Sequence, residues 1–297
     1  KVLIKFLSGK KQINEQFVKK AVKIWPVNIS DFINPHFNKS HSFKLMRFKD
    51  SIKTKRIMRR DGVEYYEYRD TVMDRDAPFR PEWIRELVYV KSNDPNNKSL
   101  KWNRGHLLHQ LTYFVGEVNF YYLDSTGRKK VAIMNTGDSM YIAPYVPHTF
   151  ASRTKNCEGY IIAITFSDKI TNKIQNEISN FNKKKINEII FSQKLKTLNK
   201  VTIKKFTKKG KNNKGVNIVQ LAKNKIIPKA NFIQINVKKP NKNTFFNEYH
   251  HYIYTLSKVA KIKIENKILN LNNGDTLYLK PFTKFLVPKV NSSFLVA

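Results

Sequence analysis

The feature that most constrains the fold is a pattern that occurs twice. Short runs rich in β-branched and aromatic residues alternate with turn signals, and the same order returns in the C-terminal half. Tyr113–Val118, followed by a strand and then by Gly137–Pro144, is echoed by Tyr254–Val259 and Gly274–Pro281. Runs of this kind predict antiparallel strands in a barrel or sandwich. Because the order repeats, we expect a duplicated β unit.

A helical rhythm precedes each β unit. Apolar residues between Ile13 and Val22 fall on one face of a predicted helix, which Pro26 ends. Residues 168–200 turn polar and helical again. We therefore predict a mainly β protein with helical segments (α+β). Its expected parts are an N-terminal helical segment (1–45), a first barrel (46–168), a second helical segment (169–205) and a second barrel (206–297).

Length and composition favour an ordered globular protein. At 297 residues and 41% hydrophobic content, the chain can bury one large or two modest cores. No apolar run approaches the roughly 20 residues of a membrane-spanning helix, and the run Val2–Ile4 is too short for a signal peptide. We therefore expect a cytoplasmic protein that does not bind membranes. Cys157 is the single cysteine, which excludes an internal disulfide and a cysteine-rich zinc site.

The net charge of +34 is compatible with nucleic-acid binding but does not require it. Lysine, asparagine and isoleucine are abundant together throughout the chain, a bias that AT-rich coding DNA produces without any function. The lysine-rich stretches, such as Lys183–Lys185 and Lys204–Lys214, also lie outside the aromatic-rich segment that carries the candidate site. We therefore predict no nucleic-acid partner. A small anionic substrate would gain from the positive field through electrostatic steering.

Two histidines and a glutamine form a candidate metal site. Residues four apart on a strand share a face, so His106 and Gln110 are expected to point together while His109 points away. His148 supplies a second imidazole after a Gly-Asp turn and a further strand. Two imidazoles and one oxygen ligand leave positions free for substrate and oxygen, as in mononuclear iron(II) oxygenases. His109, together with His36, His41 and His250, is interpreted as a hydrogen-bonded core residue.

The third ligand departs from the usual pattern of such iron sites. A carboxylate is common there, but the position expected to supply it is Ala143. Glu117 and Asp138 are the available alternatives, although Glu117 has the wrong spacing from His106 and Asp138 sits in a turn. The residues alone therefore leave the third ligand open between Gln110 and these carboxylates.

The second β unit lacks an equivalent ligand set. In the repeat register Gln110 corresponds to His251, His106 to Asn247, and His148 to Phe285. The second unit is therefore expected to be degenerate and structural.

An ordered set of motifs resembles the family of 2-hydroxyethylphosphonate dioxygenase and methylphosphonate synthase. The motifs are Arg60-Asp61-Gly62 followed by Tyr66 and Tyr68, Asn103-Arg104-Gly105-His106, and Asp138-Ser139 leading to Pro147-His148. The resemblance covers nearly the whole chain and implies tandem cupin barrels, each preceded by helices. It also implies an enzyme that uses iron(II) and molecular oxygen.

The same resemblance implies roles for single residues. In the dioxygenase branch a glutamate stands at the position of Ala143, whereas in the synthase branch a glutamine four residues after the first histidine binds iron. With Gln110 present, the chain resembles the synthase branch, and His106, Gln110 and His148 become the expected iron ligands. Arg60, Tyr68 and Asn103 are expected to bind a phosphonate, and Tyr68 and a lysine from the N-terminal helix, Lys11 or its neighbour Lys10, to assist catalysis. The alternative for Arg60 is an ion pair with Asp61.

The expected reaction is oxidative carbon–carbon cleavage of 2-hydroxyethylphosphonate, giving methylphosphonate and a one-carbon product at the oxidation level of carbon dioxide. Alternatives are a dioxygenase that gives hydroxymethylphosphonate and formate, and an epoxidase or other iron oxidase acting on a different phosphonate. A helix-turn-helix regulator with a cupin sensor domain is the alternative from another class. A homo-oligomer is expected because cupins commonly assemble.

Overall fold

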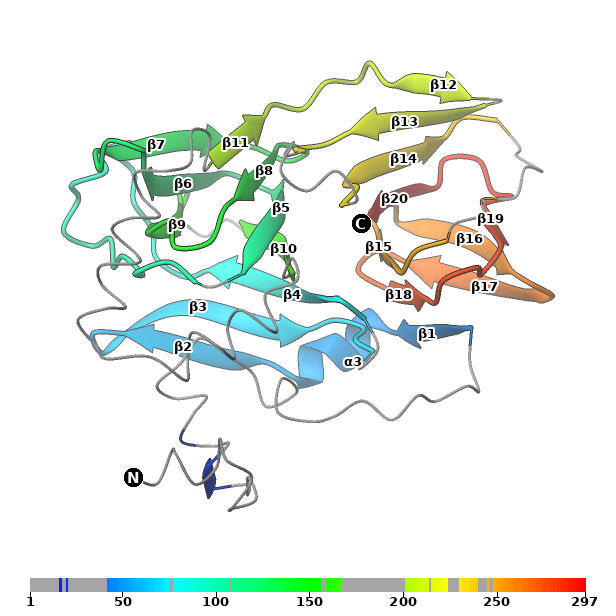
Figure 1. Cartoon of the computed structure of the whole chain (residues 1–297), viewed down its shortest axis with the longest axis horizontal. Helices are drawn as coiled ribbons and strands as arrows, with labels where there is room; N and C mark the ends of the chain where they lie inside the picture. Colours follow the sequence, from blue (N-terminus) through cyan, green and yellow to red (C-terminus); the bar gives the residue numbers. More distant parts are fainter. Residues whose placement is uncertain are drawn as a thin grey trace, which may run out of the picture.

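The computed structural model consists mainly of β-strands (Figure 1). It describes residues 16–17, 20, 42–74, 77–106, 108–155, 159–166, 201–213, 215–223, 230–239, 245 and 248–297. The predicted mainly β fold is confirmed. Helix α3 (Phe48–Lys53) is the one helix whose bounds fall within these residues. The helices expected around residues 9–32 and 168–200 lie outside them, apart from residues 16, 17 and 20, which are helical.

The first unit contains two antiparallel sheets. The strands are β2 (Arg56–Arg60), β3 (Val63–Asp70), β4 (Phe79–Glu86), β5 (His109–Val115), β6 (Val118–Leu123), β7 (Lys129–Met134), β8 (Ser139–Ile142), β9 (His148–Ser152), β10 (Tyr160–Phe166) and β11 (Val201–Lys204). A seven-stranded sheet has the order β11-β8-β5-β10-β4-β3-β2, and a three-stranded sheet has the order β7-β6-β9.

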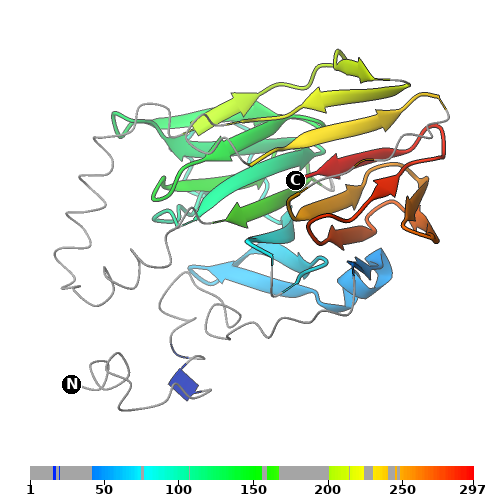
Figure 2. The ribbon, with the colours of Figure 1, turned by 45° about the vertical axis from the view of Figure 1, so that its right-hand side comes forward.

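The second unit contains the same two kinds of sheet. The strands are β1 (Phe43–Met46), β12 (Lys211–Asn213), β13 (Val216–Gln220), β14 (Ile233–Val237), β15 (His251–Thr255), β16 (Val259–Ile264), β17 (Lys267–Asn272), β18 (Thr276–Leu279), β19 (Phe285–Leu286) and β20 (Ser293–Val296). The larger sheet has the order β1-β18-β15-β20-β14-β13-β12, and the smaller has the order β17-β16-β19. The order β8-β5-β10-β4 of the first unit thus recurs as β18-β15-β20-β14 (Figure 2).

The two units exchange strands: the segment that precedes each unit in sequence forms an edge strand in a sheet of the other unit. Strand β1 precedes the first unit in sequence but pairs with β18 of the second, with Phe43 opposite Leu279. Strand β11 precedes the second unit but pairs with β8 of the first, with Val201 opposite Ile142. Residues 43–45 and 201–204 were expected to be helical, and that expectation is wrong because each segment completes the edge of a sheet contributed by the other half of the chain.

The same set of contacts, here called the clasp, follows each exchanged strand: a basic side chain and the next backbone N–H both bind one aspartate of the unit with which the strand pairs. After β1, the Arg47 guanidinium pairs with Asp275 at 2.7 Å, and the backbone N–H of Phe48 donates to the same carboxylate at 2.8 Å. After β11, Lys205 pairs with Asp138 at 2.8 Å.

The clasp of the first unit repeats the backbone bond as well, since the N–H of Phe206 donates to Asp138 at 2.8 Å. Each phenylalanine ring lies over the glycine that precedes the aspartate, where a β-carbon would come within 2.7 Å of Phe206 at Gly137 and within 2.5 Å of Phe48 at Gly274. Glycine is therefore required in both turns, for its positive φ and for the space that it leaves.

The two units share a buried boundary. Phe232, Tyr252 and Tyr254 of the second unit belong to the same apolar cluster as the core of the first. The rings of Phe79 and Tyr278 lie 6.3 Å apart across this boundary. A separate cluster fills the interior of the second unit. Within the described part of the chain, no helix has both the length and the hydropathy that a bilayer crossing demands.

Candidate metal centre and its pocket

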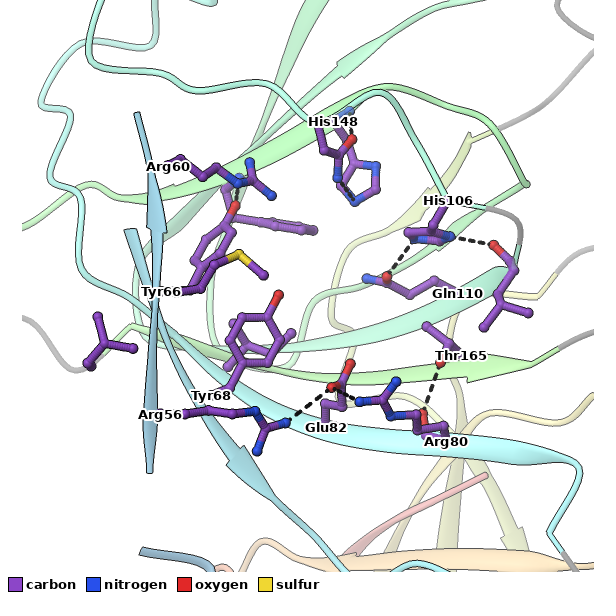
Figure 3. A pocket seen from close by; sticks show the side chains of 16 residues that line it. Arg56, Arg60, Tyr66, Tyr68, Arg80, Glu82, His106, Gln110, His148 and Thr165 are labelled. Atoms are coloured by element: carbon purple, nitrogen blue, oxygen red, sulfur yellow. Dashed lines mark hydrogen bonds and ion pairs between the residues drawn. The ribbon is translucent and has the colours of Figure 1, made fainter. Parts of the chain in front are cut away.

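The first unit encloses a cavity of about 390 Å³ between its two sheets. Strands β2, β3, β4, β5, β9 and β10 and the loop before β5 contribute its lining, which includes His106, Gln110, His148, Arg60 and Tyr68 (Figure 3). Five of the predicted site residues therefore line one cavity. Asn103 lines it as well, whereas Lys11 lies outside the described residues.

The loop before β5 is tied to the loop before β9, and this brings His106 near His148. The carboxamide oxygen of Asn103 accepts bonds from the N–H groups of Gly105 and His148, both at 2.9 Å. Gly105 has a φ of +84°, and a β-carbon there would lie 2.6 Å from the backbone of Tyr145. His106 therefore reaches the site from a glycine-dependent turn that precedes the strand, and not from β5 itself.

Hydrogen bonds to the backbone orient the two imidazoles so that Nε2 of each could bind a metal. The Nδ1–H of His106 donates to the carbonyl of Leu108 at 2.7 Å, and that of His148 donates to the carbonyl of Val146 at 2.8 Å. In a neutral imidazole this leaves a lone pair on each Nε2. The two rings meet edge to face with their centroids 5.2 Å apart. Backbone anchoring of the remote nitrogen is the usual arrangement of ligating histidines.

Both imidazoles are neutral at physiological pH. Burial lowers the pKa of His106. Burial, followed by the neighbouring His106, lowers the pKa of His148 to about 3. A metal ion binds the neutral form of imidazole, so the site already holds both rings in the form that a metal requires.

Gln110 supplies an oxygen between these rings. Its Oε1 lies 3.0 Å from Nε2 of His106, and its amide nitrogen donates to Thr112 Oγ1 at 2.8 Å. Because the amide nitrogen is used in that bond and Nδ1 of His106 carries the proton, both Oε1 and Nε2 are lone-pair atoms. Two acceptors at this separation repel each other unless a cation lies beside both, so the donor set fits a divalent metal.

No carboxylate completes this centre. Gln110 on β5 is paired with Ile142 on β8, and paired residues of antiparallel strands point to the same face. The residue of β8 that faces the site is thus Ile142, and the assignment of this position to Ala143 was wrong by one residue. Asp138 is engaged in the clasp, and Glu117 is exposed. Among the described residues, no cluster of three histidine, cysteine or acidic side chains is suited to hold a metal.

Arg60 lies on the pocket wall without a carboxylate partner. Its guanidinium donates to the carbonyl of Lys101 at 2.5 Å and stands over the rings of Tyr65 and Tyr66, at 5.0 and 4.9 Å from their centroids. Asp61, the predicted alternative partner, pairs instead with Lys101 at 3.3 Å. No ion pair within the described ranges involves Arg60, so its charge remains available to an anion.

Tyr68 and Asn103 border the same space. The Tyr68 ring packs edge to face on Tyr66 at 6.1 Å, and burial raises the pKa of its phenol, which is therefore a protonated donor. The amide nitrogen of Asn103 lies 3.0 Å from Nε2 of His148. With Nε2 as the acceptor, this amide donates to the same lone pair that a metal would use. The amide nitrogen of Asn103 therefore lies beside the position that a metal bound to His148 would occupy.

Arg56, Arg80 and Glu82 also line the pocket and were not predicted from the sequence. Arg80 and Glu82 alternate on β4, a strand that was not predicted because Pro81 interrupts it. In the structure the pairing of β4 with β3 begins only at Glu82, so the missing N–H of Pro81 falls beyond that ladder. The polar alternation Arg80, Glu82 was the available signal.

No family model matches the chain. It is 55% identical over 174 residues to methylphosphonate synthase from Nitrosopumilus maritimus (strain SCM1), a match that covers 58% of this chain and 38% of the relative. It is 30% identical over 108 residues to (S)-2-hydroxypropylphosphonic acid epoxidase from Streptomyces wedmorensis, covering 36% of this chain and 52% of the relative. The chain thus spans less than two thirds of the length of these curated relatives.

Among solved structures, the fold matches Streptomyces albus 2-hydroxyethylphosphonate dioxygenase with its substrate and Fe(II) bound. The TM-score is 0.74, the sequence identity is 26%, and the match covers 99% of this chain and 84% of the other. The resemblance predicted from the motifs is therefore confirmed in sequence and in fold.

Proposed function

We propose that this chain is an iron(II)- and oxygen-dependent enzyme that cleaves the carbon–carbon bond of 2-hydroxyethylphosphonate to give methylphosphonate and a one-carbon product at the level of carbon dioxide. The single observation that carries the proposal is the 3.0 Å distance between Gln110 Oε1 and Nε2 of His106. The other nitrogen of each side chain already donates a hydrogen bond, Nδ1 of His106 to Leu108 and the amide nitrogen of Gln110 to Thr112. This contact marks a centre built from neutral ligands.

His106, Gln110 and His148 would hold the iron. The ion would supply redox chemistry with oxygen and a Lewis-acidic position for the substrate. Because all three protein ligands are neutral, the full charge of the ion is left for the substrate and oxygen to balance. This agrees with the 55% identity to a methylphosphonate synthase over more than half of the chain.

Arg60, Tyr68 and Asn103 would bind the phosphonate. The Arg60 guanidinium offers charge-assisted bonds to a tetrahedral dianion, and the Tyr68 phenol and Asn103 amide fix its orientation. Lys11 is proposed as a further contact from the N-terminal segment. These residues would hold the anionic end of the substrate in the same pocket as the proposed metal ligands.

The architecture belongs to the same proposal. The repeated strand order is explained by tandem cupin barrels in the four predicted parts, with the second barrel degenerate and structural. A homo-oligomer without nucleic-acid or membrane partners, located in the cytoplasm, remains predicted.

Phosphorus NMR tests the reaction. The protein is loaded with iron(II) without oxygen, mixed with 2-hydroxyethylphosphonate and exposed to air. Methylphosphonate is the expected product. Hydroxymethylphosphonate would place the chain with the dioxygenase branch, and unchanged substrate would contradict both. A panel with (S)-2-hydroxypropylphosphonate separates the epoxidase alternative, which the match to the Streptomyces wedmorensis enzyme keeps relevant.

A further inference from the structure

The pocket has a second polar wall that the proposed phosphonate contacts leave unused. Nη2 of Arg80 donates to Oε1 of Glu82 at 2.9 Å, and Nη2 of Arg56 lies 3.6 Å from the same oxygen. Arg56 also pairs with Asp70 at 2.6 Å. Two guanidinium groups therefore face two carboxylates, and the wall carries no net charge. It is a poor second site for an anion, in contrast to the wall around Arg60.

Glu82 is the single carboxylate among the residues that line the pocket. Both arginine contacts end on Oε1, and the other oxygen is directed into the pocket toward the side occupied by Gln110 (Figure 3). The side chain retains 15% of its exposure, so it is enclosed by protein but open to the cavity. Its surroundings are Arg56 of β2, Asp70 and Tyr68 of β3, and Arg80 of its own strand.

The other ionisable groups of the lining cannot take up a proton. Arginine is always protonated in proteins. The phenols of Tyr66 and Tyr68 already carry their protons, since burial raises the pKa of both. The lone pairs of His106 and His148 face the proposed metal position. Among the lining residues Glu82 is thus left as the group able to accept a proton.

The hydroxyl group of the proposed substrate carries a proton that needs an acceptor if binding beside a metal releases it. A divalent cation lowers the pKa of a hydroxyl bound beside it, as zinc does for water. If the His106–Gln110–His148 centre holds such a cation, an alcohol bound there would become more acidic. A proton released there needs an acceptor within the cavity if it is not to be lost to the solvent.

We propose that Glu82 takes up the proton of the substrate hydroxyl when the substrate binds. This inference rests on the proposed function. The O–H bond breaks with its electron pair remaining on the substrate oxygen, and the proton joins the free oxygen of the Glu82 carboxylate, directly or through a water molecule. No electrons are transferred, and the total charge of the pocket does not change. The Arg56–Glu82–Arg80 wall thus holds the proton inside the pocket.

The environment of Glu82 suits this role. Burial raises the pKa of its carboxyl above the ordinary value, although Arg80 and Arg56 act to lower it. The two arginines hold the carboxylate in place in its charged form, while burial makes the protonated form easier to reach. Glu82 can therefore exist in both states within the same geometry.

Proton counting by calorimetry tests the inference. The protein, loaded with iron(II) and kept free of oxygen, is titrated with 2-hydroxyethylphosphonate in buffers of different ionisation enthalpy, which gives the number of protons released to the solvent. Ethylphosphonate, which lacks the hydroxyl, provides the baseline for the phosphonate group itself. Above that baseline the wild type is expected to release about zero protons, and the variant Glu82→Gln about one.

Glu86→Gln is the matched control. Glu86 lies on the same strand and is also buried, but it does not line the pocket, so this variant should behave like the wild type. Glu82→Asp keeps a carboxyl and is expected to retain a fraction of the proton. Binding of ethylphosphonate to each variant shows that its pocket is intact.

Two outcomes separate the possible failures. Equal proton release by the wild type and Glu82→Gln would overturn the role of Glu82 and leave the proposed function standing. Iron-loaded wild type that binds no 2-hydroxyethylphosphonate would contradict the proposed function, and with it the inference.

Discussion

The two units of this chain share their strand order but differ at a few side chains, and the difference separates structure from function. His109 of the first unit bonds to Tyr141 at 2.7 Å with the rings stacked, and His250 of the second bonds to Tyr278 at 2.6 Å in the same manner. Contacts present in both units support the fold. The interpretation of His109 and His250 as hydrogen-bonded residues is confirmed.

The contrast lies at the positions of the proposed metal ligands. His148 of the first unit corresponds to Phe285 of the second, which stacks on Phe245 at 5.1 Å. His251 meets Phe285 edge to face at 6.1 Å, much as His106 meets His148 at 5.2 Å. The second unit thus fills with aromatic rings the space that the first keeps polar. Both repeats have a packed core, and the first also contains the pocket with the proposed metal ligands.

The largest effect is expected from exchanging a ligand for a non-ligand. His148→Ala should weaken iron binding by more than about 100-fold, because loss of a group that merely orients a ligand already costs roughly 10–100-fold. His251→Ala, which removes the second-unit residue that corresponds to Gln110, should leave the iron content unchanged. Metal analysis of both purified variants measures this. Equal loss of iron would show that the second unit also contributes to metal binding.

The next effect concerns Arg60, on the side of the pocket that is proposed to bind the phosphonate. Arg60→Gln should weaken binding of 2-hydroxyethylphosphonate to the iron-loaded protein by about 10- to 150-fold, since bonds to charged groups contribute roughly 1.5–3 kcal/mol. Arg59→Gln is the control, because Arg59 is exposed on the same strand and pairs with Glu64. Calorimetry without oxygen measures both affinities. A loss shared by the two variants would indicate a general field effect and not a binding contact.

A smaller effect should be the same in both units. Asp138→Asn and Asp275→Asn each remove the charge of a buried carboxylate that clasps the exchanged strand of the other half. Each should lower the free energy of unfolding by about 1–3 kcal/mol. Urea unfolding of the two single variants provides the comparison. A loss confined to one variant would contradict the equivalence of the two clasps.

The smallest effect concerns the shared histidine–tyrosine contacts. His109→Phe and His250→Phe keep a stacked ring but remove the hydrogen bond to the tyrosine, and the loss of that bond should cost about 0.5–1.5 kcal/mol of stability. Neither should change iron content, because neither ring lines the pocket that holds the proposed metal ligands. Thermal unfolding together with metal analysis checks both statements, and iron loss in His109→Phe would assign that residue to the site.

The mainly β fold and the proximity of His106 to Gln110 were predicted from the sequence, but the structural reason for that proximity differs from the predicted one. The spacing of four residues suggested that His106 and Gln110 share a strand face, whereas β5 begins at His109. The two side chains meet because Gly105 turns the preceding loop against Tyr145. A periodicity argument identifies such neighbours but cannot describe a loop that depends on contacts elsewhere in the chain.

Long-range pairing left no signal in the sequence. Strand β1 pairs with β18, and β11 pairs with β8, but the four residues of each segment do not show which distant strand is the partner. The charged wall was missed for a related reason, because Pro81 obscured the alternation of Arg80 and Glu82. In both cases the deciding partner lies on another strand, and propensity within a window does not report it.

The exchange of β1 has a consequence for synthesis on the ribosome. Arg47 and Asp275 are 228 positions apart, so the first strand leaves the ribosome about 10–50 s before its partner at translation rates of roughly 5–20 residues per second. Throughout that interval β1 has no β18 with which to pair. The larger sheet of the second unit therefore cannot be completed during translation until β18 has been made, whereas all strands of the first unit are present once β11 has been made. A nascent chain that stalls before β18 keeps β1 unpaired and accessible to chaperones.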